Sequence, residues 1–355
     1  MNSDDTSRVP SRASGPARTS ILQIHPSLRC NLSCSHCYSS SGPVGHTELD
    51  VATICDVISD AAAMGYQVIS VSGGEPLMYR GLDDVLTHAK SLGLRTTVTT
   101  NGFFTGRDQL SRLRELVDVL AISLDGPPEI HNRIRGSVHA FERLEAGLEN
   151  IRNAGSPFGF IHTLTSRTWE HLLWVAEFAA GNGARLLQIH PLELAGRARD
   201  EMVESVAQND VLAKVYVLAF VLAAKYNDTM NVQLDLLHRD HLFDEPALVY
   251  AEVADDRSGQ ATPAQSLGLL VLEPDGTIVP VSYGFSRRYK VCNAKEQRLS
   301  DAWPSYLVNG YPSFRTLCRQ VWEGLCAPDA PILSNWHEVI VSRSHTADRS
   351  SHGSQ

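Results

Sequence analysis

The sequence predicts an α/β fold built around a parallel sheet, and two observations lead to this prediction. Short apolar stretches alternate with longer helix-like stretches six times between residues 20 and 200, which is typical of parallel strands joined by right-handed crossovers. Each loop that carries reactive or ligand-binding residue types follows one of these predicted strands. In barrels of parallel strands such loops meet at one end and build the active site, whereas a doubly wound open sheet is the alternative fold for six units.

The strands are predicted where short apolar runs are bounded by polar or turn residues. They cover residues 21–24, 68–71, 95–100, 117–123, 158–164 and 186–190. Helices are predicted between them where apolar residues recur at helical spacing, over residues 51–64, 82–92, 108–116, 141–154 and 168–180. Either Thr47 or Asp50 can cap the first helix.

The second half of the chain is predicted to add smaller elements. A long helix rich in Val, Leu and Ala is expected over 201–226, and the mixed, polar segment 227–265 is expected to be a loop or a lid. Pro274-Asp275-Gly276 separates two apolar stretches and predicts a hairpin turn. Two short helices and a final strand are expected over 299–308, 314–325 and 339–341.

These elements divide the chain into five predicted parts. They are a disordered N-terminal arm (1–19), an α/β barrel domain (20–200), a helical linker with a lid (201–265), a small α+β domain (266–341) and a disordered tail (342–355). The two terminal parts are predicted to be disordered because they offer little apolar surface to bury.

The composition excludes several classes of protein. Hydrophobic residues make up 43% and charged residues 20% of the 355 residues, as in ordinary globular proteins. The net charge of −9 lacks the basic footprint of nucleic-acid binding, and no apolar run of about 18 residues predicts a membrane helix. The N-terminus lacks the apolar core of a secretory signal. Seven cysteines without such a signal indicate the cytoplasm and cofactor binding, not disulfides.

Cys30, Cys34 and Cys37 form a Cys-x3-Cys-x2-Cys triplet soon after the first predicted strand. Three thiolates on one short loop can hold three corners of a cubane iron–sulfur cluster and leave one iron open to another ligand. The alternative is a structural zinc site closed by His36 or His25, but zinc ligands usually come as two separated pairs. The compact triplet therefore favours a cluster with one open iron.

This spacing resembles the radical S-adenosylmethionine (SAM) superfamily, and the resemblance extends over residues 21–200. It implies a [4Fe–4S] cluster and SAM as cofactors, and a partial (β/α)6 TIM-like barrel as the fold. It also implies the chemistry. One electron from an external reductant such as flavodoxin or ferredoxin splits SAM, and the resulting 5′-deoxyadenosyl radical abstracts hydrogen from a substrate C–H bond.

Further motifs resemble the SAM-binding positions of that superfamily. Gly73-Gly74-Glu75-Pro76 follows the second strand, where two glycines let the backbone approach a ligand, and it resembles the segment that meets the amino group of SAM. Asn101, Ser123 and Arg135 match positions that contact the ribose or the carboxylate, tasks that suit amide, hydroxyl and guanidinium groups. An ordinary turn at Asn101 is the alternative for that residue.

Two more stretches resemble the superfamily near the same site. Tyr38 matches an aromatic position that packs near the adenine of SAM, with a buried core tyrosine as the alternative. His190-Pro191-Leu192-Glu193 with Gly196-Arg197 resembles a loop that follows the sixth strand beside SAM. His190 could face the substrate, but a histidine satisfied at a strand end is the more ordinary interpretation. The sequence assigns no catalytic residue.

Residues 272–280 and 299–303 resemble the SPASM/twitch extensions of radical SAM peptide maturases. Those extensions normally carry cysteines for auxiliary clusters, one of them directly after a proline that matches Pro280, where this chain has Val281. Cys292, Cys318 and Cys326 do not fit their spacing, and Cys318 lies on an apolar helical stripe. We therefore expect a degenerate domain that serves as a scaffold.

The most specific functional hypothesis is maturation of a ribosomally synthesised peptide, because peptide modifiers dominate this subgroup. About 20 residues precede the first strand, so either a separate leader-peptide-binding protein is an expected partner or the segment 227–265 is expected to recognise the leader. One alternative is a radical SAM oxidoreductase that acts on a small metabolite or a tetrapyrrole. The other is an iron–sulfur electron-transfer or binding protein without SAM turnover, against which the SAM-like motifs count.

Overall fold

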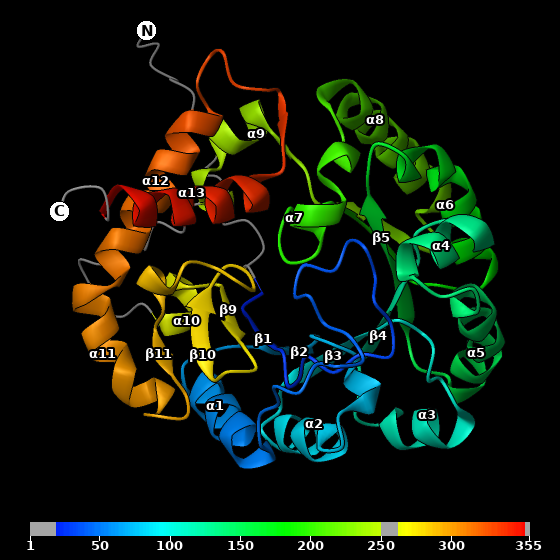
Figure 1. The fold of residues 1–355 in the computed structure, drawn as a ribbon, viewed down its shortest axis with the longest axis horizontal. Helices are drawn as coiled ribbons and strands as arrows, with labels where there is room; N and C mark the ends of the chain where they lie inside the picture. The colour runs from blue at the N-terminus through cyan, green and yellow to red at the C-terminus, as the bar shows by residue number, and fades with distance from the viewer. Residues whose placement is uncertain (1–18, 250–261, 352–355) are drawn as a thin grey trace, which may run out of the picture.

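A long sheet organises the computed structural model, which describes residues 19–249 and 262–351 (Figure 1). Within these residues the sheet has ten strands in the order β11-β10-β9-β1-β2-β3-β4-β5-β6-β7. The strands from β1 to β7 pair in parallel, β9 lies parallel to β1, and β10 and β11 are antiparallel. The predicted partial barrel of parallel strands is therefore confirmed.

The strands lie close to their predicted positions. They are β1 Ile21–Ile24, β2 Val68–Val71, β3 Arg95–Thr100, β4 Val119–Ser123, β5 Phe158–Leu164, β6 Leu186–Pro191, β7 Asn231–Leu234, β9 Leu269–Leu272, β10 Thr277–Pro280 and β11 Cys292–Asn293. A separate pair joins β8 Leu237–His238 to β12 Leu333–Ser334.

Most helices surround the strands on the outer side of the barrel (Figure 1), whereas the last helix contacts the loop after β6 through Glu338. The helices are α1 Val51–Ala63, α2 Leu82–Ser91, α3 Arg107–Leu113, α4 Pro128–Arg135, α5 Ala140–Ala154, α6 Leu172–Gly181, α7 Ala198–Glu201, α8 Asn209–Tyr226, α9 Arg239–Asp244, α10 Pro263–Ser266, α11 Leu299–Asn309, α12 Tyr311–Leu325 and α13 Trp336–Ser351. Of the two predicted caps of α1, Asp50 is the one used, because its carboxylate accepts the N–H of Thr53 at 2.8 Å.

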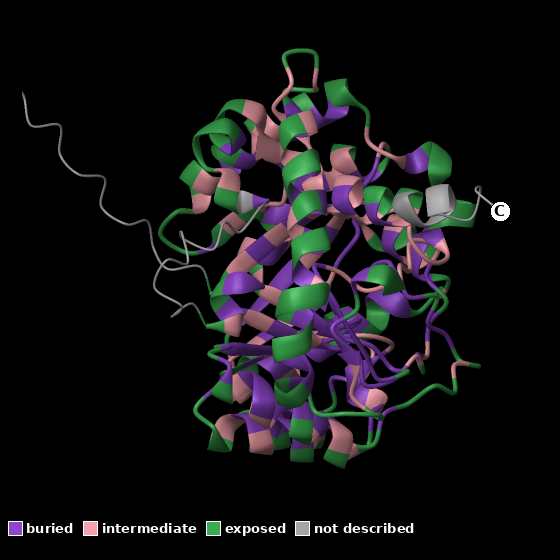
Figure 2. Cartoon of the chain, turned by 90° about the vertical axis from the view of Figure 1, so that its left-hand side faces the viewer, coloured by how far each residue is buried: buried purple, intermediate pink, exposed green. Residues whose placement is uncertain are grey.

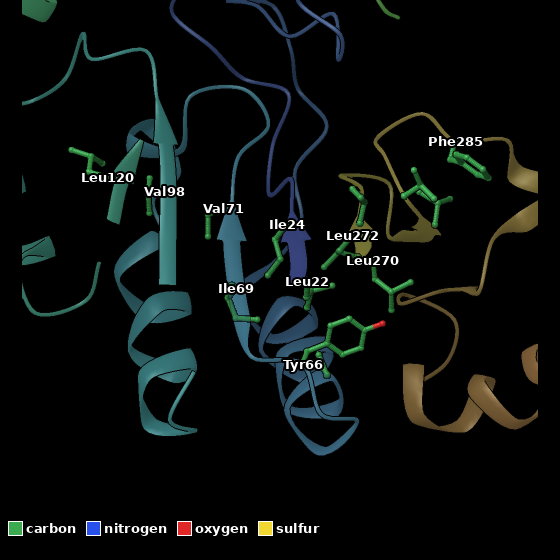
Figure 3. Close-up of a cluster of buried hydrophobic side chains, with 14 of the residues drawn as sticks. Leu22, Ile24, Tyr66, Ile69, Val71, Val98, Leu120, Leu270, Leu272 and Phe285 are labelled. Atoms are coloured by element: carbon green, nitrogen blue, oxygen red, sulfur yellow. The ribbon is translucent and has the colours of Figure 1, made fainter. Parts of the chain in front are cut away.

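Alternation along the strands separates the core from the inner face of the barrel. Leu22 and Ile24 of β1 are fully buried toward the helices, and Figure 3 shows them packed with apolar residues of β2 and β9. Gln23 points the other way, and the register places it beside Ser70 of β2, which in turn lies beside Thr97 of β3. The inner face therefore carries polar side chains among apolar ones, while burial is concentrated on the strands and the inner sides of the helices (Figure 2).

The C-terminal part continues the barrel sheet. Four residue pairs, from Ile21↔Leu269 to Ile24↔Leu272, join β1 to β9. Arg298, just before α11, donates to the exposed Asp56 and the buried Asp60 of α1 at 2.8 and 2.7 Å. Strand pairing and ion pairs thus fix the predicted SPASM/twitch-like region (266–341) against the first barrel unit.

Three predictions for the second half are wrong. The segment 201–265 is not only linker and lid, because β7 within it extends the sheet beside β6. The predicted strand 339–341 is part of α13, which continues to Ser351, so residues 342–351 of the predicted disordered tail are helical. Other elements bury or hydrogen-bond with polar side chains of this helix. Ser344 is fully buried, and the Arg343 guanidinium donates to the Gln320 carbonyl at 2.8 Å. All but one residue of the predicted arm 1–19 lies outside the described residues.

None of the helices in the described ranges is both long and apolar enough to span a bilayer.

Candidate active site

The cysteine triplet lies in the long loop between β1 and α1, at the carboxyl ends of the parallel strands. Cys30 and Cys34 are buried, Cys37 is half-buried, and all three pack with Leu32 and Phe103. They line a cavity of about 630 Å³ on the inner face of the barrel. Because the loops after several strands border this cavity, the sequence motifs that follow those strands come together in space.

Nitrogen donors point at two of the three sulfurs. The Asn101 amide lies 3.8 Å from the Cys30 Sγ, and the Arg135 guanidinium lies 3.8 Å from the Cys34 Sγ. Burial raises the pKa of the Cys30 thiol to about 12, and burial also raises the pKa of Cys34 although the positive charge of Arg135 opposes it. Metal binding here would therefore displace protons from thiols.

Arg135 is held by a buried carboxylate. Its Nε and Nη2 donate to the two oxygens of Asp125 at 2.7 and 3.3 Å, and Asp125 is fully buried. The His36 ring lies 3.3 Å from the same carboxylate. Burial alone would raise the pKa of Asp125, but the charge of Arg135 and the contact with His36 outweigh it, so that pKa lies well below its usual value.

The two glycines after β2 are required by the cysteine loop. Gly73 has φ +110°, and a Cβ on Gly74 would lie 2.1 Å from the carbonyl oxygen of Arg29. The N–H of Gly74 donates to the Ser27 carbonyl at 2.9 Å. Both glycines line the cavity. A side chain here would push the cysteine loop away from β2.

Glu75 and Pro76 do not line the cavity. The buried Glu75 carboxylate accepts hydrogen bonds from the Leu77 N–H, the Thr100 hydroxyl and the Asn101 N–H at 3.1, 2.7 and 2.8 Å. Pro76 begins a short 3₁₀ turn. In the structure Glu75 therefore joins the loop after β2 to the end of β3.

The other predicted SAM-binding residues border the cavity. Ser123 lies at the end of β4, and Asn101 follows β3. The Tyr38 hydroxyl lies 3.1 Å from the Ser72 hydroxyl, and its ring contacts the ring of Tyr283 edge-on at 5.8 Å. Nine of the eleven residues predicted from the sequence thus line one cavity, namely Cys30, Cys34, Cys37, Tyr38, Gly73, Gly74, Asn101, Ser123 and Arg135.

Sequence reasoning named His190 and Glu193 but missed the charged group that they form with Asp235 on the cavity wall. His190 lies between two carboxylates, with Nδ1 2.9 Å from Asp235 and Nε2 3.1 Å from Glu193. Burial disfavours protonation of His190, but hydrogen bonds to both carboxylates raise its pKa to about 10. Asp235 follows the unpredicted β7, so the only available signal was the resemblance of the His190–Glu193 loop to the superfamily.

The C-terminal hairpin also reaches the cavity. Val281, Ser282 and Tyr283 line it, and Val281 has φ +70°, a strained conformation for a β-branched residue. The Tyr283 ring stacks on His25 at 4.7 Å. The sequence did not identify Tyr283 because its position depends on the pairing of β9 with β1.

The donor set fits a cubane cluster better than a zinc site. Of the two histidines that could have closed a zinc site, His36 contacts Asp125 and His25 stacks on Tyr283. Among the described residues, no group of three or more His, Cys, Asp or Glu side chains is arranged to hold a metal ion. Three thiols of one loop, with N–H groups beside two of them, suit three corners of a cubane cluster.

The remaining cysteines lie elsewhere. Cys292 and Cys318 are buried in the main core, where burial raises the pKa of each to about 12, and Cys326 ends α12. Cys55 is half-buried on α1.

Comparisons with known proteins agree with this site. Residues 24–179 match the model of the radical SAM superfamily. The chain is 26% identical over 287 residues to Fe-coproporphyrin III synthase of Methanosarcina barkeri, spanning 78% of this chain and 71% of that protein. It is 27% identical over 215 residues to sporulation killing factor maturation protein SkfB of Bacillus subtilis, spanning 60% of this chain and 52% of SkfB.

The fold also resembles solved structures. SuiB of Streptococcus suis, solved with bound S-adenosylmethionine, aligns with a TM-score of 0.66 at 18% identity, covering 84% of this chain and 68% of SuiB. SuiB has also been solved bound to the precursor peptide SuiA. The segment 24–179 that matches the radical SAM superfamily carries the cysteine triplet and much of the cavity lining, and this match supports an enzyme of that superfamily, which uses a [4Fe–4S] cluster and SAM.

Proposed function

We propose that this enzyme modifies a ribosomally synthesised peptide by forming a C–C or C–heteroatom bond. When bound, the cluster and SAM supply a radical that abstracts hydrogen from an unactivated C–H bond. The protein's own residues hold the cofactors, orient the peptide and exclude water from the cavity.

The main support for this proposal is the net negative charge of one group on the cavity wall. His190, Asp235 and Glu193 together bear a net charge of about −1 at neutral pH, because the pKa of His190 is about 10 and those of both carboxylates are lowered. Among the described residues that line the cavity there is no lysine, and the only arginine is Arg135, which Asp125 already binds. A tetrapyrrole with several carboxylates would need cationic partners. A peptide offers N–H donors and amines, which suit this wall.

The proposed roles of the cavity residues follow their positions. Cys30, Cys34 and Cys37 would hold the cluster, and the backbone around Gly73 and Gly74 would meet the amino group of SAM. Asn101, Ser123 and Arg135 would contact its ribose or carboxylate, and Tyr38 its adenine. Glu75 and Pro76 would act through the shape of the loop, since neither lines the cavity. An external one-electron reductant such as flavodoxin or ferredoxin, a separate leader-peptide-binding protein and a cytoplasmic location remain predictions.

The competing function is a tetrapyrrole reaction, which the similarity to Fe-coproporphyrin III synthase over 78% of this chain favours. The reconstituted, dithionite-reduced enzyme should be incubated with SAM and either short peptides encoded beside its gene or Fe-coproporphyrin III. We expect a peptide that loses two hydrogens by mass spectrometry while 5′-deoxyadenosine forms. Turnover of the porphyrin with every peptide unchanged would overturn the proposal, and a Cys30/Cys34/Cys37→Ala variant is the control for cluster-dependent turnover.

A further inference from the structure

We propose that Arg135, positioned by Asp125, acts on the iron–sulfur cluster itself by donating a charged hydrogen bond to a cluster thiolate, which raises the reduction potential of the cluster. This role differs from the contact with the SAM carboxylate that the sequence predicted. It concerns the cofactor and not the substrate, so it stands whether the substrate is a peptide or a tetrapyrrole.

The geometry of the guanidinium supports this role. Two of its nitrogens, Nε and Nη2, are bound to the Asp125 carboxylate at 2.7 and 3.3 Å, and the third, Nη1, lies 3.8 Å from the Cys34 Sγ. Bidentate binding fixes the plane of the guanidinium. Asp125 therefore aims the remaining nitrogen at the sulfur.

The backbone keeps Arg135 in this position. The N–H of Ser35, next to Cys34, donates to the Ile134 carbonyl at 2.9 Å. Gly136 follows with φ +68°, and a Cβ on it would lie 3.0 Å from the Ser33 carbonyl oxygen. The C-terminus of α4 is thus packed directly against the cysteine loop, so Arg135 and Cys34 cannot separate without moving both segments.

Burial makes the charge effective. The Asp125 side chain is fully buried and Arg135 is only 7% exposed, so solvent screens their charges weakly. Arg135 creates a positive electrostatic field at the Cys34 sulfur, and the negative charge of Asp125 reduces that field. The field at the cluster is therefore a balance between the two, and removing either one should shift it in the opposite direction from removing the other.

The affected step is the addition of one electron, taken from an external one-electron reductant, to the oxidised cluster, with no bond broken in the protein. Positive charge and N–H donors at the sulfurs stabilise the more negative, reduced cluster. Arg135→Gln should therefore lower the midpoint potential. Asp125→Asn should raise it, because the amide oxygen of Asn still accepts a hydrogen bond from the guanidinium while the negative charge is lost. A defect that only loosened the site would not give shifts of opposite sign.

The test is an EPR-monitored redox titration of the reconstituted full-length protein without SAM, in wild type, Arg135→Gln and Asp125→Asn. Arg133→Gln, at an exposed position on the same helix, is the matched control and should leave the potential unchanged. SAM affinity should be measured in parallel by equilibrium binding. The expected result is a lower potential for Arg135→Gln and a higher one for Asp125→Asn, already present without SAM.

Three results would overturn the proposal. The first is a wild-type potential in both variants, and the second is a shift of both potentials in the same direction. The third is a wild-type potential in Arg135→Gln together with weakened SAM binding, which would assign Arg135 to the SAM carboxylate alone. If Arg135→Gln and Asp125→Asn fail to take up iron, the reduction potential of Arg135→Lys tests the proposal instead. This variant keeps the buried charge but cannot bind Asp125 and Cys34 at once, so a wild-type potential in Arg135→Lys would count against the proposal and a lowered one would support it.

Discussion

The backbone N–H of Arg197 donates to the carbonyl oxygen of Cys37 at 2.9 Å, so the loop after β6 is fixed to the cysteine loop after β1. The Arg197 guanidinium adds hydrogen bonds to the carbonyl oxygens of Cys34 and Ser41. These contacts join the loop after β6 to the second and third cysteines of the triplet and to Ser41. The shape of the cysteine loop therefore depends on residues more than 150 positions away.

Replacing Gly196 should disturb this closure. Gly196 has φ +53°, and a Cβ there would lie 2.3 Å from the Tyr38 carbonyl oxygen. We expect Gly196→Ala to lower the free energy of unfolding by about 1–3 kcal/mol and to reduce iron uptake, measured by urea denaturation and iron analysis. Gly181→Ala, in α6 with no atom within 4 Å of its added Cβ, is the control. Equal stability of the two variants would contradict the prediction.

The cysteine triplet should account for all the iron. Wild type reconstituted without oxygen should bind about four irons per chain, and the Cys30/Cys34/Cys37→Ala variant should bind almost none. A Cys292/Cys318/Cys326→Ala variant should lose stability, because two of these thiols are core residues, yet keep its iron. About eight irons in wild type, with about four surviving loss of the triplet, would show an auxiliary cluster instead.

Glu75→Gln should weaken the loop after β2. The carboxylate accepts three hydrogen bonds in a buried site, and an amide NH₂ cannot accept, so at least one donor loses its partner. We expect a loss of about 1–3 kcal/mol in the free energy of unfolding. Glu48→Gln, at an exposed position, should change it little, and similar losses in the two variants would disprove the assigned role of Glu75.

The His190 group should make stability depend on pH. Its pKa is raised to about 10 in the folded protein, above the unfolded value of about 6.5, so the stabilisation by protonated His190 is full below about pH 6.5 and declines as the pH rises toward 10. The difference in unfolding free energy between wild type and His190→Gln should therefore shrink from pH 6 to pH 10. The exposed His46→Gln should show no such trend, and a difference for His190→Gln that stays constant over this range would refute the raised pKa.

Sequence alone predicted the chemistry of the site because that chemistry is local. Three cysteines within eight residues, two glycines directly after a strand, short apolar runs and apolar residues at helical spacing can all be recognised in short segments of sequence. They led to the parallel sheet, its inner-face loops and nine residues of one cavity.

Tertiary structure decided what distant segments contribute. β7 has no fully buried residue, so it lacks the apolar signal of a strand, and only its pairing with β6 brings Asp235 to His190. The polar segment that forms α13 is helical because other elements hydrogen-bond with its side chains or bury them. Likewise, Arg135 faces Cys34 because Asp125 binds it from ten residues away. Local sequence patterns determine the helices and strands. The partners of buried charges and of strand edges come from distant segments, so they are brought into place only when the chain folds.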